Sequence, residues 1–197
     1  MGSKRMIRIY LKVILIGDGG VGKTTIVKRY IMRTFSSEYI PTIGVNVYDY
    51  KNKITINSAV FHASWSIWDL AGQPTFRDVV ERYFDKARGV LLVFDITRRD
   101  TFESIPTWFN TALPHVHKAA AFILVGNKID LRNRCPDCVR KEEGEYLAKN
   151  LSKAINFEIP YIETSAKEGI NIELIFKEVL KLHLKRLGLL KKLLHHP

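Results

Sequence analysis

The chain has 197 residues, 46% of them hydrophobic and 11% aromatic, which suits one domain with a buried core and excludes a disordered chain. Lysine and arginine exceed aspartate and glutamate by 31 to 20, and the net charge of +11 favours anionic partners: nucleotide, lipid head groups or nucleic acid. No apolar run is long enough to cross a membrane, and residues 11–16 are too few for the apolar part of a signal peptide, so we expect an intracellular protein.

Apolar runs alternate with helical stretches along the chain. In chain order, the pattern predicts a strand at 9–16, a helix at 23–32, strands at 45–56 and 60–68 joined by a turn near Asn57, a helix at 75–84, a strand at 90–94, a helix from Pro106 to about 117, a strand at 122–125, a helix at 140–151, a short strand at 161–162, and a helix at 172–187.

Several of these strands are apolar throughout, so both of their faces must be covered. Strands of this kind that alternate with helices indicate an α/β fold, a mainly parallel sheet with helices on both faces. Ligands of such sheets bind beyond the carboxyl ends of the strands. Functional residues are therefore expected after Ile16, Trp68, Val125 and Ile162.

A glycine-rich segment follows the first strand and opens the first helix. It fits the pattern G-x-x-x-x-G-K-[ST] with Gly17, Asp18, Gly19, Gly20, Val21, Gly22, Lys23 and Thr24. Glycines let the backbone N–H groups curl around phosphates, a lysine here reaches the β- and γ-phosphates, and a hydroxyl binds Mg²⁺. The N-terminus of the helix adds its partial positive charge, and we include Thr25 among the nucleotide-binding candidates.

A second polar segment, residues 69–73, follows the strand that ends at Trp68. Asp69 can hold Mg²⁺ through water, as the second carboxylate of phosphate-loop proteins does. Gly72 can bring its N–H close to a γ-phosphate because it has no side chain, and Gln73 can orient the attacking water. Aspartate and glycine also commonly end strands, so this segment indicates a phosphate site only in combination with the glycine-rich segment.

Two further segments point to a guanine base. Asn127, Lys128 and Asp130 follow a buried strand, and the carboxylate of Asp130 can accept two hydrogen bonds from guanine that adenine does not offer. Lys128 can lie across the base, and Asn127 can tie this loop to the phosphate loop. Ser165, Ala166 and Lys167 follow the last strand, where small residues let backbone N–H groups reach guanine O6. This triplet alone proves little.

The loop before the second strand carries two more candidates. Thr42 can give its hydroxyl to Mg²⁺ and its N–H to a γ-phosphate, and Phe35 can stack on guanine or serve as a core aromatic. A loop with few strong local structure formers suits a segment that becomes ordered with a γ-phosphate. Elsewhere, Cys135 and Cys138 form a Cys-x-x-Cys pair that lacks the partners of a zinc site, and we interpret them as two loop cysteines rather than a redox motif.

Together these segments resemble the Ras superfamily of small GTPases, closest to its Rab and Ras branches, and the resemblance covers roughly residues 9–187. It implies a six-stranded phosphate-loop fold and a GTP-binding switch that hydrolyses GTP with Mg²⁺. It implies that Lys23, Thr24, Thr42, Asp69, Gly72 and Gln73 form the phosphate and magnesium site. The guanine site would contain Phe35, Asn127, Lys128, Asp130, Ser165, Ala166 and Lys167. Gly19 matches the position where larger side chains hinder hydrolysis.

The sequence departs from that family in three places. Pro74 stands where an acidic residue usually follows the glutamine, which bears on nucleotide exchange and on the second switch loop. No cysteine lies near the C-terminus for prenylation, and Met6 breaks the myristoylation pattern that Gly2 begins. The chain is then expected to be an unlipidated member, a prokaryotic or archaeal relative, or a shortened chain.

We weigh three functions: an active GTPase switch, a GTP-bound scaffold with negligible hydrolysis, and a small-molecule kinase. Gln73 and Gly19 favour the switch over the scaffold, and nothing marks the arginine-rich lid that a kinase needs.

The expected division is an N-terminal extension at 1–8, a GTPase domain at 9–187 and a basic, leucine-rich tail at 188–197. We expect a cytoplasmic protein with effector, exchange-factor and activating partners and no nucleic acid, whose tail is a candidate for weak contact with an anionic membrane.

Overall fold

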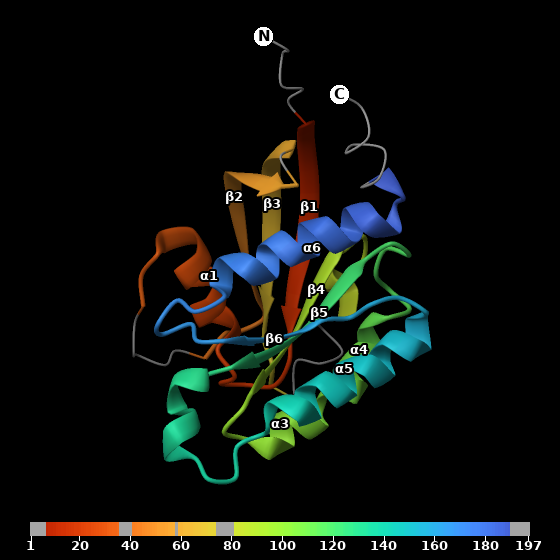
Figure 1. Ribbon diagram of the computed structural model, residues 1–197. Helices are drawn as coiled ribbons and strands as arrows, with labels where there is room; N and C mark the ends of the chain where they lie inside the picture. Colours follow the sequence, from red (N-terminus) through yellow and green to blue (C-terminus); the bar gives the residue numbers. More distant parts are fainter. Residues whose placement is uncertain (1–6, 36–40, 58, 74–80, 190–197) are drawn as a thin grey trace.

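Six strands form one sheet in this computed structural model, which describes residues 7–35, 41–57, 59–73 and 81–189 (Figure 1). The sheet order is β2-β3-β1-β4-β5-β6. The strand bounds are β1 Ile7–Ile16, β2 Val45–Ile56, β3 Ala59–Leu70, β4 Gly89–Asp95, β5 Ala121–Asn127 and β6 Tyr161–Thr164. β2 and β3 pair antiparallel and the other neighbours pair parallel, which confirms the α/β class and the mainly parallel sheet.

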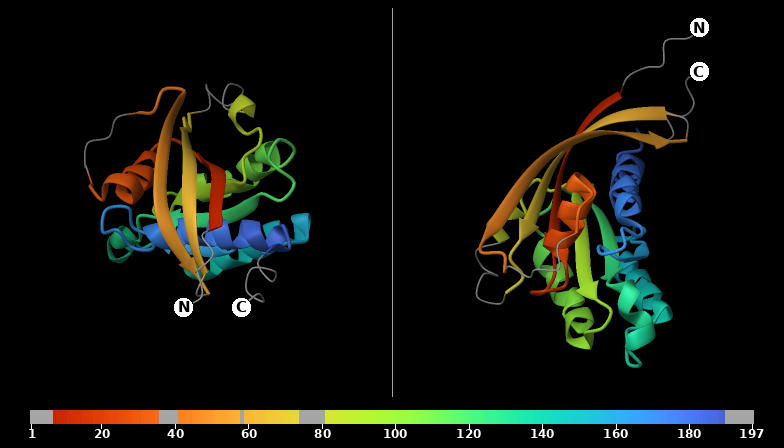
Figure 2. Two further views of the ribbon diagram at one scale, coloured as in Figure 1. Left: turned by 90° about the horizontal axis from the view of Figure 1, so that it is seen from above. Right: turned by 90° about the vertical axis from the view of Figure 1, so that its left-hand side faces the viewer.

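Helices cover both faces of the sheet, as the apolar strands require (Figure 2). Their bounds are α1 Lys23–Met32, α3 Arg99–Glu103, α4 Ile105–Ala112, α5 Lys141–Ile155 and α6 Ile172–Arg186. α1 and α6 pack on one face, in a core that contains Leu11, Val13 and Leu15 of β1. α4 and α5 pack on the other face, in a core that contains Ile14 and Ile16.

An aromatic stack fixes the first helix in place. The ring of Tyr30 on α1 lies 3.8 Å from the ring of Phe176 on α6, and the two planes are inclined by only 8°. The indole of Trp65 on β3 contacts both rings edge-on. Since aromatic pairs add to the free energy gained by burial, this cluster holds α1, and with it the glycine-rich loop before it, against the sheet.

The helix expected from Pro106 to about residue 117 is partly wrong. The helix found here, α4, begins at Ile105 but already ends at Ala112, and the short helix α3 before it was not expected. Pro114 has no N–H to continue the helical hydrogen bonds, and the N–H of His117 bonds to the carbonyl of Ala87 instead. The chain is thereby turned toward the start of β5.

Other boundaries differ by small amounts. β1 begins two residues before the expected position, β3 continues to Leu70, and α5 continues to Ile155. A 3₁₀ helix at Ile129–Arg134 was not expected. The helix expected at 75–84 lies largely outside the described residues, whose part of it contains a 3₁₀ turn at Glu81–Tyr83.

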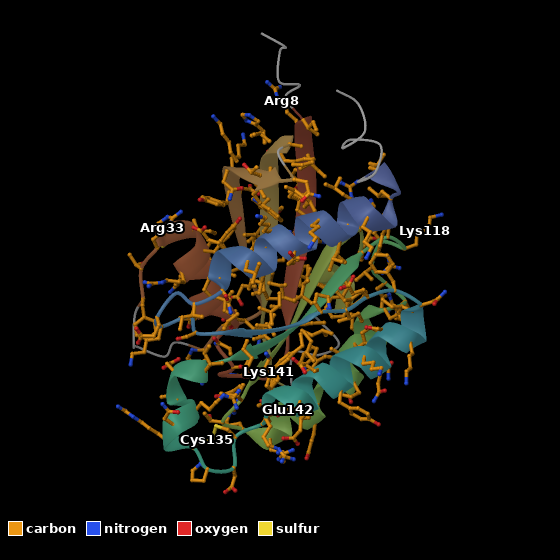
Figure 3. All side chains as sticks on the ribbon, in the orientation of Figure 1. Arg8, Arg33, Lys118, Cys135, Lys141 and Glu142 are labelled. Atoms are coloured by element: carbon orange, nitrogen blue, oxygen red, sulfur yellow. A yellow bond between two sulfur atoms is a disulfide. The ribbon has the colours of Figure 1, made fainter. Side chains whose placement is uncertain are left out.

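Cys135 and Cys138 lie in the loop before α5, as expected, and their sulfur atoms are joined in a disulfide (Figure 3). The bridge closes a loop of the chain with a sequence separation of 3, and Cys138 packs into the core beside α5. Within the described part of the chain, no helix has both the length and the apolar character needed to cross a membrane.

Candidate functional site

A cavity of about 540 Å³ lies beyond the carboxyl ends of β1, β3 and β5. Most residues expected at a nucleotide site line it: Gly19, Gly20, Gly22, Lys23, Thr24, Thr25, Phe35, Thr42, Gly72, Gln73, Asn127, Lys128, Asp130, Ala166 and Lys167. The remaining candidates, Gly17, Asp18, Val21, Asp69 and Ser165, stand behind these residues and contact them. Segments that are far apart in sequence thus surround one space at the edge where α/β sheets bind ligands.

The glycine-rich loop needs glycine at two positions for a physical reason. Gly17 and Gly22 have φ angles of 139° and 101°, a region that side chains rarely adopt. A Cβ on Gly17 would overlap the carbonyl of Val93, and one on Gly22 would overlap the amide of Asn127. The loop can therefore lie close against both β4 and the loop after β5.

Lys23 is folded back over this loop. Its ammonium donates to the carbonyl oxygens of Gly17 at 2.7 Å and Asp18 at 2.8 Å. The side chain is almost fully buried, and burial lowers its pKa to about 8, against the opposing charges of Asp69 and Asp18. A lysine in such surroundings gains from an anion in the cavity, because the anion restores the favourable environment of the charged form.

Oxygen atoms of three residues meet beside Lys23. The hydroxyl of Thr24 lies 2.5 Å from Asp69 Oδ2 and 2.9 Å from the hydroxyl of Thr42. Asp69 is fully buried, and its other oxygen, Oδ1, has no hydrogen-bond partner among the described residues. Burial raises the pKa of this carboxyl, while the Thr24 hydroxyl and the Lys23 charge act in the opposite direction.

This oxygen cluster fits Mg²⁺. Carboxylate and hydroxyl oxygens are the ligands that this hard cation prefers, and Mg²⁺ is commonly bound by one or two protein groups together with phosphates and water. A buried carboxylate oxygen without a partner is costly unless a cation or a donor satisfies it. Thr24, Thr42 and Asp69 therefore form a set of oxygen donors into which Mg²⁺ fits.

The other end of the cavity is built by the loops after β5 and β6. Asn127 Oδ1 accepts from the hydroxyl of Thr164 at 3.1 Å and from the N–H of Ala166 at 3.2 Å. The hydroxyl of Ser165 donates to Asp130 Oδ1 at 2.6 Å and thereby fixes the position of that carboxylate in the cavity lining. Phe35, which is 41% exposed, and Lys128 line the same cavity as Asp130 and Lys167.

Sequence reasoning missed two groups of residues. Lys28, Thr34, Leu70 and Leu131 also line the cavity, but no motif distinguishes them from ordinary neighbours of the motifs. Asp95, Arg98 and Trp108 lie behind the glycine-rich loop and are hydrogen-bonded to it or to its lysine partner. A signal existed for Asp95, because it is a charged residue directly after the buried strand at 90–94.

The fold and this site define the class of the protein. A glycine-rich loop lies between a central strand and a helix, an Asn-Lys-x-Asp loop lines the same cavity, and an oxygen cluster lies beside them. These are the parts of a small GTPase. The sequence model of the Ras family matches residues 12–185, and the chain therefore belongs to the Ras family.

Individual relatives are Rab-like. The chain is 39% identical to the Ras-related protein SEC4 of Saccharomyces cerevisiae over 172 residues, which is 87% of this chain and 74% of the relative. It is 35% identical over 174 residues to Rab-26 of Rattus norvegicus, covering 88% of this chain and 63% of the relative. It is 36% identical over 171 residues to human Rab-37, covering 86% and 71%.

These comparisons confirm the resemblance to the Rab branch of the Ras superfamily. The chain is a GTP-binding molecular switch and a GTPase, as its family is.

Proposed function

We propose that the cavity holds GTP with its phosphates at the glycine-rich loop and its guanine at Asp130. The observation that carries this orientation is the separation of two kinds of groups around one space. The ammonium of Lys23 and the Thr24, Thr42 and Asp69 oxygens lie at one end, and the Ser165-held carboxylate of Asp130 lies at the other. Phosphates need the positive charge of the lysine and a metal held by the oxygens, whereas the guanine N1–H and amine need a carboxylate that accepts hydrogen bonds.

In this proposal each phosphate-site residue has a defined task. Lys23 neutralises the β- and γ-phosphates, and the N–H groups of Gly72 and Thr42 contact the γ-phosphate. Thr24, Thr42 and, through water, Asp69 would hold Mg²⁺, which supplies positive charge to the phosphates when it is bound. Gly17, Asp18, Gly19, Gly20, Val21, Gly22 and Thr25 form the backbone cradle around the phosphates.

Hydrolysis needs positioning and charge neutralisation more than a strong base, because the transferred phosphoryl group is loosely bound in the transition state. Gln73 lines the cavity next to the glycine-rich loop, and a Cβ on Gly19 would lie 3.7 Å from its Cγ. We assign Gln73 the orientation of the attacking water. No arginine is among the described residues that line the cavity, so turnover by the chain alone is slow and an activating protein accelerates it.

At the base end, Asn127, Lys128, Asp130, Ser165, Ala166, Lys167 and Phe35 would hold guanine. Loss of the γ-phosphate removes the contacts of Thr42 and Gly72 and resets the two loops that carry them. Effectors, exchange factors and activating proteins would recognise this difference. Pro74 and the expected second-switch helix lie outside the described residues, so their part in exchange remains a prediction.

We place the protein in the cytoplasm, with a division into an extension at 1–8, a GTPase domain at 9–187 and a tail at 188–197. The tail continues the leucine and lysine pattern of α6, but residues 190–197 lie outside the described residues. Contact of its leucines and basic residues alone with an anionic membrane would be weak, reversible and sensitive to salt.

Turnover of GTP and ATP by the purified chain, with Mg²⁺ and with excess EDTA, tests this function directly. We expect GTP to be hydrolysed in Mg²⁺, little hydrolysis in EDTA, and no competition from ATP. ATP binding as tight as GTP binding would contradict the guanine site. Tight GTP binding without any turnover would leave only the scaffold alternative.

A further inference from the structure

Five consecutive carbonyl oxygens of the glycine-rich loop accept hydrogen bonds from side chains. Those of Gly17 and Asp18 accept from Lys23, as described above, and the carbonyl of Val21 accepts from Asn127 Nδ2 at 2.9 Å. Between them, the carbonyl of Gly20 accepts from Lys128 Nζ at 2.9 Å, and that of Gly19 accepts from Arg98 Nη2 at 2.7 Å. The carbonyls are thus held by Lys23 of the same segment and by side chains from two other segments, the turn after β4 and the end of β5.

The direction of these carbonyls also sets the direction of the N–H groups. In a planar trans peptide, the C=O of one residue and the N–H of the next point to opposite sides. The bond from Arg98 to the Gly19 carbonyl therefore aims the N–H of Gly20, and the bond from Lys128 to Gly20 aims the N–H of Val21. Gly19 and Gly20 line the cavity, so the N–H of Gly20 becomes a fixed donor for an anion.

Both of these cations are held by one buried carboxylate. Asp95, the last residue of β4, is 2% exposed, and its Oδ2 lies 2.6 Å from Lys128 Nζ and 3.6 Å from Arg98 Nε. Its Oδ1 accepts from the N–H of Thr97 at 2.9 Å and from the Thr97 hydroxyl at 2.8 Å. Because the second oxygen is held by Thr97, the carboxylate has a fixed orientation toward the two cations.

We infer that Asp95 and Arg98 are positioning residues of the nucleotide site, which hold the backbone of Gly19 and Gly20 in the conformation that binds phosphate. Neither residue lines the cavity, so both act through the loop and not on the nucleotide. Arg98 contributes a bond that the Asn-Lys-x-Asp loop does not provide, and Asp95 joins that bond to Lys128. This inference rests on the proposed binding of guanine nucleotide.

The test compares Arg98→Ala, Arg98→Lys and the control Arg99→Ala. Arg99 is the next residue in the chain, but its guanidinium pairs with Glu143 on α5, away from the loop. Dissociation of a fluorescent GDP analogue, chased with excess GDP in Mg²⁺, is the first measurement. Loss of this charge-assisted hydrogen bond should raise the dissociation rate of Arg98→Ala on the order of tenfold, because the Gly19 carbonyl and the N–H of Gly20 are then no longer held in one direction.

The expected pattern separates positioning from simple stabilisation. Arg98→Lys should recover part of the slow dissociation, because lysine keeps the charge but not the forked geometry. Arg99→Ala should match the wild type. Urea unfolding of the nucleotide-free proteins should place Arg98→Ala near the wild type, since the Arg98 side chain is 40% exposed. Dissociation from Arg98→Ala within twofold of the wild type would overturn the inference.

Asp95→Asn tests the shared anchor. It removes the charge that both cations face, so GDP should dissociate faster from Asp95→Asn than from Arg98→Ala. GDP dissociation from the double variant should stay within about twofold of that from Asp95→Asn, because effects within one network are not additive. Independent, multiplying effects would contradict the common anchor. A wild type that does not retain GDP would instead defeat the proposed function, which distinguishes the two failures.

Discussion

The side-chain amide of Asn127 joins the Asn-Lys-x-Asp loop to the glycine-rich loop, because its Nδ2 donates to the carbonyl oxygen of Val21 at 2.9 Å across 106 residues of sequence. The same side chain accepts hydrogen bonds from Thr164 and Ala166 through Oδ1. One buried amide thus connects the loops after β1, β5 and β6. Hydrogen bonds to protein groups take the place of hydrogen bonds to water at both of its polar atoms.

Asn127→Ala should therefore both destabilise the fold and loosen the nucleotide. Three hydrogen bonds at about 1 kcal/mol each predict a loss of about 3 kcal/mol in the free energy of unfolding. Urea denaturation of the nucleotide-free protein measures the first effect, and GDP dissociation measures the second. Asn110→Ala, on the exposed side of α4, is the matched control and should change neither quantity.

Asp130→Asn should change the preference for the base. An asparagine donates where the aspartate accepted, so it suits the ring carbonyl of xanthine better than the amine of guanine. We expect the ratio of XTP to GTP affinity to rise by about a hundredfold or more, since two hydrogen bonds to a charged group are exchanged. Competition binding with GTP, XTP and ATP measures this ratio. Asp137→Asn, an exposed change in the next loop, should leave it unchanged.

Gln73→Leu should slow hydrolysis without weakening binding. Leucine has a similar size but neither a donor nor an acceptor for water, so the single-turnover rate should fall by about tenfold to a hundredfold. GDP affinity should stay within about twofold of the wild type, because Gln73 lies beside Gly19 and is assigned to the attacking water and not to the nucleotide. If the variant hydrolysed GTP at the wild-type rate, the attacking water would have to be oriented by another residue.

His183 should make stability depend on pH. It is 2% exposed on α6, and its Nδ1 lies 2.8 Å from the carbonyl oxygen of Ala119. Burial lowers its pKa, the Ala119 bond opposes this, and the charges of Arg88, His117 and Arg186 add to the lowering. The unfolded chain then binds the proton first, near the ordinary pKa of about 6.5, so the contribution of His183 is fully present above that pH and is lost as the pH falls.

Urea unfolding between pH 7.5 and pH 5 checks this expectation. The difference in free energy of unfolding between the wild type and His183→Gln should shrink toward low pH, because only the wild type carries the buried titrating ring. His115→Gln, a change at an exposed histidine, should follow the wild-type curve in parallel. Parallel curves for His183→Gln as well would show that the ring titrates normally in the folded protein.

Much of the fold could be predicted because the pattern of apolar residues is strong in the central strands. β4 and β5 are buried at every residue, and the helix after Gly22 follows directly from its loop. The early end of α4 could have been predicted from Pro114, which has no N–H to continue the helix. The bond of His117 to Ala87, which then turns the chain, could not be predicted, because folding alone brings these two residues together. The same holds for the 3₁₀ helix at Ile129–Arg134, which no periodicity distinguishes from a loop.

The candidate site divides in the same way. Residues of a contiguous motif, such as Lys23 and Thr24, could be found from their spacing alone. Arg98 could not, because its bond to Gly19 spans 79 residues and an arginine in a polar turn has no distinctive sequence signal. Asp95 could have been found, since a carboxylate at the carboxyl end of a buried strand lies at the edge where such sheets bind ligands.

The start of β1 and the end of α6 lie at the same end of the molecule, and the cavity lies at the other (Figures 1 and 2). β1 alone, with its 10 residues, separates Ile7 from the phosphate loop by about 33 Å at the usual rise of a parallel strand. A fluorophore, an affinity tag or a surface tether attached before Ile7 or after Leu189 would thus leave the cavity and the loops that line it open. If the protein were immobilised through either end, nucleotide and regulators could reach the same face of the molecule without obstruction.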